Sequence, residues 1–302
     1  MPSLWPLIAR KPKTVSPLDL RIKSLRSLEE FRASYAAGNP DLGPGSWAAP
    51  VTTESRFDVP GYCFVDQRYV AFEMDDLYAS RCDGKVAYNW RERMTCPACG
   101  LNNRHRGAIH VFQALLHPSF RSRIWLTEKL SPLYKVLNPR YPSLVGSEFL
   151  GDDKESGWVS PIGVRHEDIT NCSFPDQTLD AVLSFDVLEH VPDPEVAFRE
   201  TYRVLAPGAA LLFSVPFLFW DYESRIRSRR LADGTIEHIL PPQYHSDPFN
   251  SADGILVYRD FGWDVIDQLK AAGFSDAYCA MYQSVDYGYV GDPQVIFVAT
   301  KS

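Results

Sequence analysis

The sequence lacks any apolar run near the ~20 residues that a membrane-spanning helix needs. Its first residues, MPSLWPLIARKPK, also lack the apolar centre of a secretion signal. We therefore expect a cytoplasmic protein with no membrane partner. Only 6 of 302 residues are cysteine, and in an intracellular chain these are expected to be metal ligands or core residues rather than disulfides. The formal net charge of −7 argues against an extended surface for nucleic acid or anionic lipid.

The most informative stretch is residues 164–208, in which an apolar run at 179–184 is followed by DVLEHVPDP. The run predicts a strand buried on both faces. Asp193 and Pro194 stand at the N-cap and the first position of a helix. A Pro-Gly pair ends that helix before the next apolar run, AALLFSV. Strand, helix and strand in this order predict a right-handed parallel crossover with a ligand crevice at the carboxyl ends of the strands.

Similar runs alternate with helical patterns from residue 121 onward. RIWLTE, PSLVGSEFLG and IGVRHEDIT predict three strands that precede the two already described. DFGWDVIDQLKAAGF predicts a helix, and SDAYCAMY and PQVIFVAT predict two final strands. This alternation is typical of an α/β fold with a mostly parallel sheet.

Residues 164–208 closely resemble the middle of class I S-adenosylmethionine (SAM) dependent methyltransferases, the type 11 methyltransferase domain in particular. The resemblance implies a Rossmann-like sheet, mostly parallel with an antiparallel C-terminal hairpin, over residues 108–302. It also implies SAM as the cofactor. The crevice then lies beside Phe185, Asp186 and Val187, which we expect to face the cofactor.

A SAM site needs an acid for the ribose hydroxyls and a polar group for adenine at successive strand ends. Glu148, followed by Phe149, meets the first need, and Asp168, followed by Ile169, meets the second. After the first strand, Glu128 matches the leading acid of the family's glycine-rich turn.

No glycine follows Glu128, because the sequence there is EKLSPL. Glycine lets the backbone approach a ligand closely and adopt positive φ cheaply. Ser131 and Pro132 can instead cap and start a helix. We therefore expect SAM to bind in an altered pose.

Methyl transfer to a hydroxyl or a carbon acid requires removal of a proton. The candidate bases are His190, after the fourth strand, and His245 with Tyr244, in the segment QYHSDP. Each histidine could equally be a packed or hydrogen-bonded residue. Residues 220–254 form a long insertion, which we expect to be a lid over the acceptor, with a basic tip that is mobile without ligand.

Before the main domain, residues 1–54 predict an N-terminal helix, from Ser16 to Ala37, and a linker. Residues 55–107 predict a small module in which FDVPGYCFVD and YVAFEMD are strands. RHRGAIHVFQALLHP predicts an amphipathic helix that leads into the main domain, with His105 facing solvent at its start.

The motif CPACG places Cys96 and Cys99 at the spacing of a structural zinc site. The region resembles the zinc-ribbon-like or zinc-knuckle-like module ahead of some type 11 methyltransferase domains. In those, an earlier CxxC supplies the second pair, whereas here Cys63 is followed by Asp66. Cys82 competes as the fourth ligand. An ordinary turn with free thiols is the alternative.

These features predict a SAM-dependent methyltransferase that acts on an oxygen or nitrogen of a small metabolite or natural-product intermediate. The missing glycines leave open a non-methylating member of the fold, such as a cyclase or a pseudoenzyme, which the retained acids oppose. The basic segments CGLNNRHRG and RIRSRR leave open a nucleic-acid methyltransferase. The negative net charge and the lack of interleaved aromatic residues oppose that reading.

Overall fold

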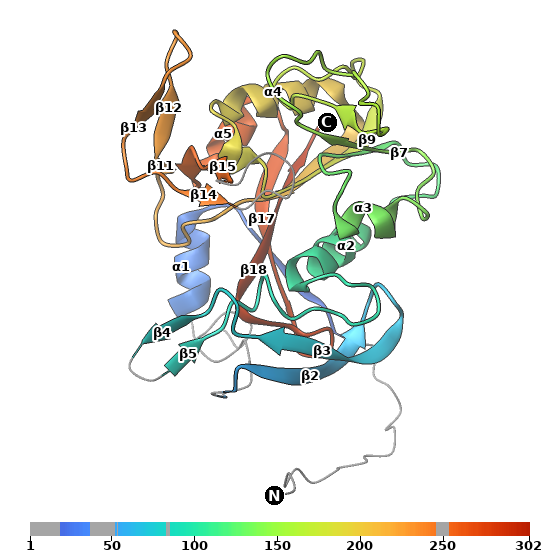
Figure 1. The fold of residues 1–302 in the computed structure, drawn as a ribbon, viewed down its shortest axis with the longest axis vertical. Helices are drawn as coiled ribbons and strands as arrows, with labels where there is room; N and C mark the ends of the chain where they lie inside the picture. Colours follow the sequence, from blue (N-terminus) through green and yellow to red (C-terminus); the bar gives the residue numbers. More distant parts are fainter. Residues whose placement is uncertain (1–18, 37–51, 53, 83–84, 246–253) are drawn as a thin grey trace, which may run out of the picture.

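The computed structural model describes residues 19–36, 52, 54–82, 85–245 and 254–302, and an eight-stranded sheet organises them (Figure 1). The strand order is β1-β17-β18-β10-β9-β6-β7-β8. The parallel strands are β10 (Leu205–Ser214), β9 (Leu179–Phe185), β6 (Ile124–Leu126), β7 (Leu144–Glu148) and β8 (Arg165–His166). The antiparallel strands are β18 (Tyr289–Thr300), β17 (Asp276–Ser284) and β1 (Arg21–Leu25).

This sheet confirms the predicted α/β fold with a mostly parallel sheet and an antiparallel C-terminal hairpin. The chain runs outward from β6 through β7 to β8 and then returns to β9 on the other side of β6. Ligands of open α/β sheets bind at such a reversal, outside the carboxyl ends of the strands. By this rule, the expected ligand position is between the ends of β6 and β9.

Four helices flank the sheet: α2 (Asn103–Leu116), α3 (Pro132–Leu137), α4 (Pro194–Val204) and α5 (Val265–Ala271). Side chains of α4 and α5 share a core with one face of the sheet, and side chains of α2 and α3 share a core with the other. The predicted N-caps are present, since Ser131 accepts a hydrogen bond from the Tyr134 amide and Asp193 from the Val196 amide.

The N-terminal stretch corrects our prediction of one helix from Ser16 to Ala37, whose two ends lie outside the described residues. Residues 21–25 form β1 and pair with β17, and α1 (Leu28–Ala36) starts only afterwards. The Ser27 hydroxyl accepts from the Glu30 amide at 3.2 Å, and the Glu30 carboxylate accepts from the Arg26 amide at 2.7 Å. The pattern is a variant of the capping box in which the acid bonds the amide one residue before the cap, and it marks the true helix start.

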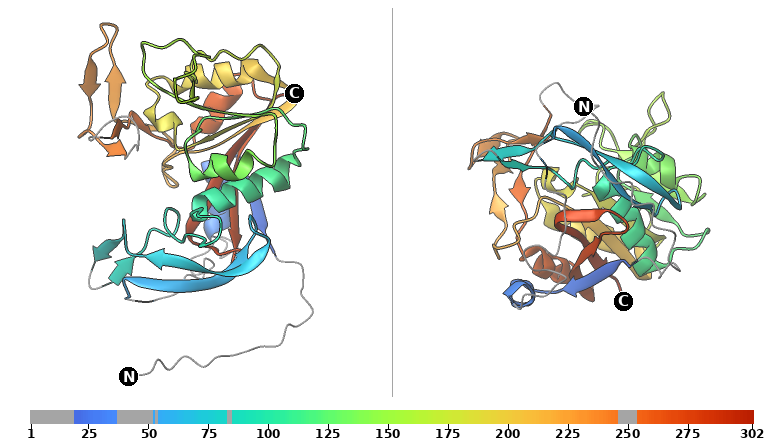
Figure 2. Two further views of the ribbon diagram at one scale, coloured as in Figure 1. Left: turned by 45° about the vertical axis from the view of Figure 1, so that its right-hand side comes forward. Right: turned by 90° about the horizontal axis from the view of Figure 1, so that it is seen from below.

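The N-terminal module contains the hairpin of β2 (Arg56–Cys63) and β3 (Arg68–Asp75) and the shorter pair β4 (Ser80–Cys82) and β5 (Lys85–Ala87). Figures 1 and 2 show β17 and β18 running from the sheet to this hairpin. The Tyr62 amide donates to the Asp286 carbonyl at 2.7 Å. The module also shares its core with α2 and the sheet. The domain limits at 54, 107 and 302 remain a prediction.

The insertion at 220–254 contains short strands rather than an open loop. β11 (Arg225–Ile226) pairs with β16 (Arg259–Asp260), and β14 (Tyr244–His245) pairs with β15 (Ile255–Leu256). The predicted basic tip is the hairpin of β12 (Ser228–Arg230) and β13 (Ile236–His238), which projects at the upper left of Figure 1. Within QYHSDP, the residues from 246 onward lie outside the described residues. Among the described helices, none combines the length and apolarity needed to cross a bilayer.

Candidate functional site at the carboxyl edge of the sheet

The turn that follows β6 is held by an acid from the neighbouring strand. The Glu148 carboxylate, at the end of β7, accepts hydrogen bonds from the Lys129 and Leu130 amides, each at 2.8 Å. Ser131 then caps α3. The turn that lacks glycine is therefore shaped by a charged side chain, which orders its backbone amides at the edge of the sheet.

Glu128, the first residue of that turn, is half-buried, and its Oε1 atom is fully enclosed. Burial raises its pKa to about 7, against the lowering effects of a hydrogen bond from Ser131 and the charge of Arg104. Its Oε1 atom is buried without a hydrogen-bond partner among the described residues. A buried polar atom left unpaired costs stability, and such an atom at a ligand edge indicates a missing partner.

Asp186, immediately after β9, has the opposite environment. Arg91 binds its two oxygens at 2.8 and 2.7 Å, and the Ser214 hydroxyl donates to it at 2.7 Å. Arg104 lies 3.4 Å away. Burial alone would raise the pKa of Asp186, but the charges of Arg104 and Arg91 outweigh it and hold the pKa well below its ordinary range. Asp186 therefore anchors the N-terminal module to the sheet.

Arg104 lies on α2 between these two acids. Its Nε atom also binds Glu92 at 3.0 Å. Its Nη1 atom, however, is buried without a hydrogen-bond partner in the described structure. The edge thus holds an unpaired carboxyl oxygen on Glu128 and an unpaired guanidinium nitrogen on Arg104. Together they complement a zwitterion that carries an ammonium and a carboxylate.

The other predicted cofactor residues lie along the same edge with mixed exposure. The Asp168 carboxylate accepts from the amide and the hydroxyl of Thr170, at 2.8 and 2.7 Å, and so forms its own turn after β8. Ile169 is buried in the core, whereas Phe149 is exposed beside Glu148. Phe185 is buried at the end of β9, and Val187 is half-buried after it.

The candidate bases lie together around a buried acid. His190, in the short helical turn η1 (Leu188–His190), has Nδ1 at 2.8 Å from the Leu256 carbonyl. Its Nε2 lies 3.6 Å from Glu189, and Nδ1 of His245 lies 3.5 Å from the same carboxylate oxygen. The nearby carboxylate of Glu189 raises the pKa of His245 above its ordinary value. Tyr244 is exposed on β14, next to this group.

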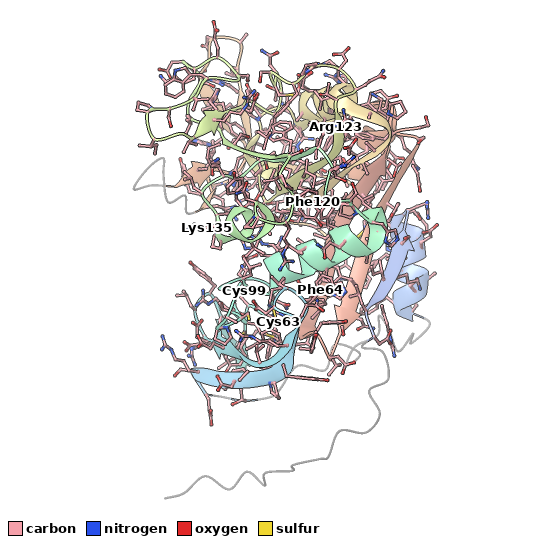
Figure 3. All side chains as sticks on the ribbon, turned by 90° about the vertical axis from the view of Figure 1, so that its right-hand side faces the viewer. Cys63, Phe64, Cys99, Phe120, Arg123 and Lys135 are labelled. Carbon is pink, nitrogen blue, oxygen red and sulfur yellow. The ribbon has the colours of Figure 1, made fainter. Side chains whose placement is uncertain are left out.

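The predicted metal ligands Cys63, Asp66, Cys96 and Cys99 form one cluster in the module, beneath α2. The Cys63 and Cys99 sulfurs are 3.9 Å apart, and the Cys96 thiol lies 3.1 Å from the Asp66 carboxylate. All four ligand atoms lie within 4.8 Å of one another. Figure 3 shows Cys63 and Cys99 side by side. The cluster has four members without Cys82, which ends β4 and whose side chain lies outside the described residues.

Sequence reasoning missed the two arginines, Arg91 and Arg104, that reach this edge from the N-terminal module. It also placed His105 in solvent, whereas the structure half-buries it near Arg104, and burial holds its pKa well below the ordinary value. The segment NWRERM carried no recognisable motif. The alternation of basic residues in NNRHRG was visible, but it pointed toward nucleic acid rather than toward an internal acid.

Comparison with known proteins finds that this part of the chain is similar to a methyltransferase domain. Residues 147–213, which run from β7 to β10, match the sequence model of that domain. A probable S-adenosylmethionine-dependent methyltransferase of Mycolicibacterium smegmatis is 36% identical over 108 residues. The aligned part covers 36% of this chain and spans 37% of the length of that relative.

Solved structures are similar in outline. A putative S-adenosylmethionine-dependent methyltransferase from Listeria monocytogenes aligns with a TM-score of 0.38 at 15% identity, over 65% of this chain and 98% of that one. The 1,6-didemethyltoxoflavin-N1-methyltransferase of Burkholderia thailandensis aligns with a TM-score of 0.40 at 16% identity, over 66% and 78%. These likenesses carry no weight for the activity of this chain.

Proposed function

We propose that this chain is a SAM-dependent methyltransferase. The carrying observation is the pair of unpaired buried atoms at the sheet edge, Oε1 of Glu128 and Nη1 of Arg104. SAM carries an amino-acid head whose ammonium would bind Glu128 and whose carboxylate would bind Arg104. The match to a methyltransferase domain over residues 147–213 supports the same reading.

The rest of the donor extends along the strand ends. A carboxylate offers about four lone-pair sites, so Glu148 can accept ribose hydroxyls while it holds the Lys129 and Leu130 amides. Asp168 and the backbone of its turn would bind the adenine edge. The exposed ring of Phe149 would pack against the ribose and adenine. Because Glu148 rather than glycine shapes the first turn, we expect the donor to sit farther from this backbone than a glycine turn would allow.

SAM, when bound, supplies a methyl group on a positively charged sulfur. The protein's own contribution is to align an acceptor with that carbon, exclude water and accept a proton at a histidine nitrogen. His245 is the first candidate, because its pKa is raised by Glu189 and it lies on the insertion. Arg230 of the insertion reaches Asp152 beyond β7, so the insertion already spans the edge as a lid would.

The acceptor is proposed to be a small molecule that offers an oxygen or a nitrogen, bound under this lid. The central test is calorimetric titration of the protein with S-adenosylhomocysteine, followed by transfer of labelled methyl from SAM to a panel of hydroxyl and amine acceptors. We expect binding in the micromolar range or tighter, and at least tenfold weaker binding for Glu128→Gln and Arg104→Ala. Arg123→Ala, which removes an exposed arginine at the opposite end of β6, is the matched control.

Absence of binding at millimolar ligand would refute the proposal. Binding without transfer to any acceptor would instead support the non-methylating reading, in which the fold holds SAM but performs other chemistry.

We also propose a structural zinc ion at Cys63, Asp66, Cys96 and Cys99. The donor set fits, because zinc takes four tetrahedral ligands from thiolates and carboxylates, and these four atoms already converge. Metal analysis of protein purified without chelator should find zinc, and Cys99→Ser should lose it together with thermal stability. Cys172→Ser, at a buried cysteine outside the cluster, is the control. Equal zinc content in all variants would refute the site.

A further inference from the structure

Glu189, which lies beside the two candidate bases, is a buried acid. Glu189 is fully buried, and neither of its carboxylate oxygens makes a hydrogen bond within the described part of the chain. Moving an unpaired carboxylate out of water costs several kcal/mol, so buried carboxylates in folded proteins are paired or bind metal ions. Two imidazole nitrogens, from His190 and His245, lie 3.6 and 3.5 Å from its Oε1 atom.

The tautomer of His190 decides what can lie between its Nε2 atom and the Glu189 carboxylate. Its Nδ1 is 2.8 Å from the Leu256 carbonyl, which can only accept, so Nδ1 carries the hydrogen. In the neutral ring, Nε2 therefore presents a lone pair to the Glu189 carboxylate. Two lone pairs facing each other repel unless a cation lies between them. A backbone carbonyl that fixes the far nitrogen of a histidine is also the usual outer partner of a metal ligand.

The distances suit an ion better than direct hydrogen bonds. Hydrogen bonds between nitrogen and oxygen are about 2.7–3.2 Å long, and both separations here are longer. Ligand atoms bound at about 2.0–2.2 Å to one tetrahedral ion lie about 3.4 Å apart. The three ligand atoms lie within 4.8 Å of one another. One carboxylate and two imidazoles are a donor set typical of divalent transition metals.

We propose that Glu189, His190 and His245 bind a divalent transition-metal ion, a site separate from the cysteine cluster. Two of the ligands come from the η1 turn after β9, and the third comes from β14 of the insertion. The ion would thus fasten the insertion to the end of the sheet. His245 is partly exposed, so the remaining coordination positions open on its side. If the proposed methyl transfer holds, an oxygen atom of the acceptor is the ligand expected there, and the ion rather than His245 would then make that oxygen more acidic.

Cobalt(II) titration of the chelator-stripped, full-length protein tests the site independently of any activity. Thiolate coordination in the cysteine cluster gives an intense sulfur-to-cobalt charge-transfer band, whereas imidazole and carboxylate ligands give only weak visible bands. We expect wild type to show both sets of bands, with saturation at more than one ion per chain. Glu189→Gln and His245→Ala should retain the sulfur band and lose the second set, with at least tenfold weaker binding at that step.

His238→Ala is the matched control, because His238 is an exposed histidine of the same insertion that bonds only to Ser228 among the described residues. It should titrate like wild type. Cys99→Ser should lose the sulfur band and keep the second set. His245→Gln tests the site even if the Glu189 variant does not fold, because it changes a partly exposed residue. Circular dichroism checks that each variant is folded. The proposed site is refuted, whatever the result of SAM binding, if cobalt titrates like wild type in all three variants: Glu189→Gln, His245→Ala and His245→Gln. A wild type that shows the sulfur band alone overturns it equally.

Discussion

Two carboxyl groups at the same sheet edge, Glu128 after β6 and Asp186 after β9, have been given opposite properties. Both are half-buried near Arg104. The pKa of Glu128 is raised to about 7, whereas that of Asp186 is held well below its ordinary range. The difference is the bidentate pairing with Arg91, which Asp186 has and Glu128 lacks.

Of these two acids, Asp186 is paired within the protein, whereas Glu128 is left available to a ligand. Asp186 is saturated by two arginines and a serine, so it holds the module in place and has little left for a ligand. Glu128 is half-buried and its Oε1 atom is unpaired within the described residues, so a cationic ligand would stabilise it more than Asp186. The position of an acid at a strand end therefore does not by itself determine its role. The arginines that the N-terminal module places beside it do.

The largest effect is expected from Asp186→Asn. Removing the carboxylate leaves Arg91 and Arg104, whose side chains are 29% and 13% exposed, without their shared counter-charge, which should lower the free energy of unfolding by about 3 kcal/mol. Urea unfolding followed by circular dichroism measures it. Asp176→Asn, whose aspartate is mostly exposed beside Arg203, should cost no more than about 1 kcal/mol. Equal losses in the two variants would mean that Asp186 is no anchor.

Glu128→Gln should change the pH dependence of stability. The folded carboxyl keeps its proton up to about pH 7, while the ordinary value is 4.5. Its contribution is therefore complete below pH 4.5 and is lost as pH rises through 7, by roughly 2–3 kcal/mol. The variant should lack this decline when unfolding is measured across that range. Glu155→Gln, at an exposed glutamate, should keep it. A wild type with no decline would show that Glu128 ionises freely.

Glu148→Ala should weaken binding of S-adenosylhomocysteine by roughly 1–3 kcal/mol, because it removes charged hydrogen bonds to the turn and, by our proposal, to the ribose. Calorimetry measures the change. Glu148→Gln keeps one accepting oxygen and should lose less, and Asp153→Ala, at an exposed aspartate nearby, should bind like the wild type. If alanine and glutamine weaken binding alike, the negative charge matters more than the single accepting oxygen that glutamine keeps.

The smallest effect is expected from Ser131→Ala, which removes the cap of α3 and should cost about 1 kcal/mol. The same hydroxyl lowers the pKa of Glu128 by a hydrogen bond, so its loss should move the pH-dependent decline to higher pH. Ser131→Thr retains the hydroxyl and should preserve both properties. A lower stability with no change in the pH at which stability falls would show that Ser131 caps α3 without affecting the pKa of Glu128.

Much of this edge could be predicted from local patterns. Apolar runs placed β6, β7, β9 and β10, and the acids that follow them lie where expected, because the carboxyl ends of parallel strands share an edge. The spacing of CPACG and the isolated Cys63 and Asp66 also predicted the cluster that the structure shows. These features depend on short stretches of chain whose geometry is set by their own residues.

The rest depends on packing between distant segments. Arg91 and Asp186 are 95 residues apart, and nothing in NWRERM identifies its partner. The sequence predicted a helix where β1 lies, because Leu and Ile in LRIKSLRSL recur at spacings that suit both a helix and a strand. The segment forms a strand because the edge of β17 is available to pair with it. The pairing of Glu189 with two histidines likewise needs β14 to fold back onto η1.

The long β17–β18 hairpin has a consequence for how the chain folds during synthesis. β1 pairs with β17 some 250 residues later, and Arg106 of α2 donates to the Tyr287 carbonyl in the β17–β18 turn. These N-terminal segments are therefore synthesised before the strands that they pack against. Their apolar faces stay exposed until residues 276–300 have been synthesised. Truncation within this last hairpin should thus expose β1 and the β2–β3 hairpin to proteolysis, although they lie far away in the sequence.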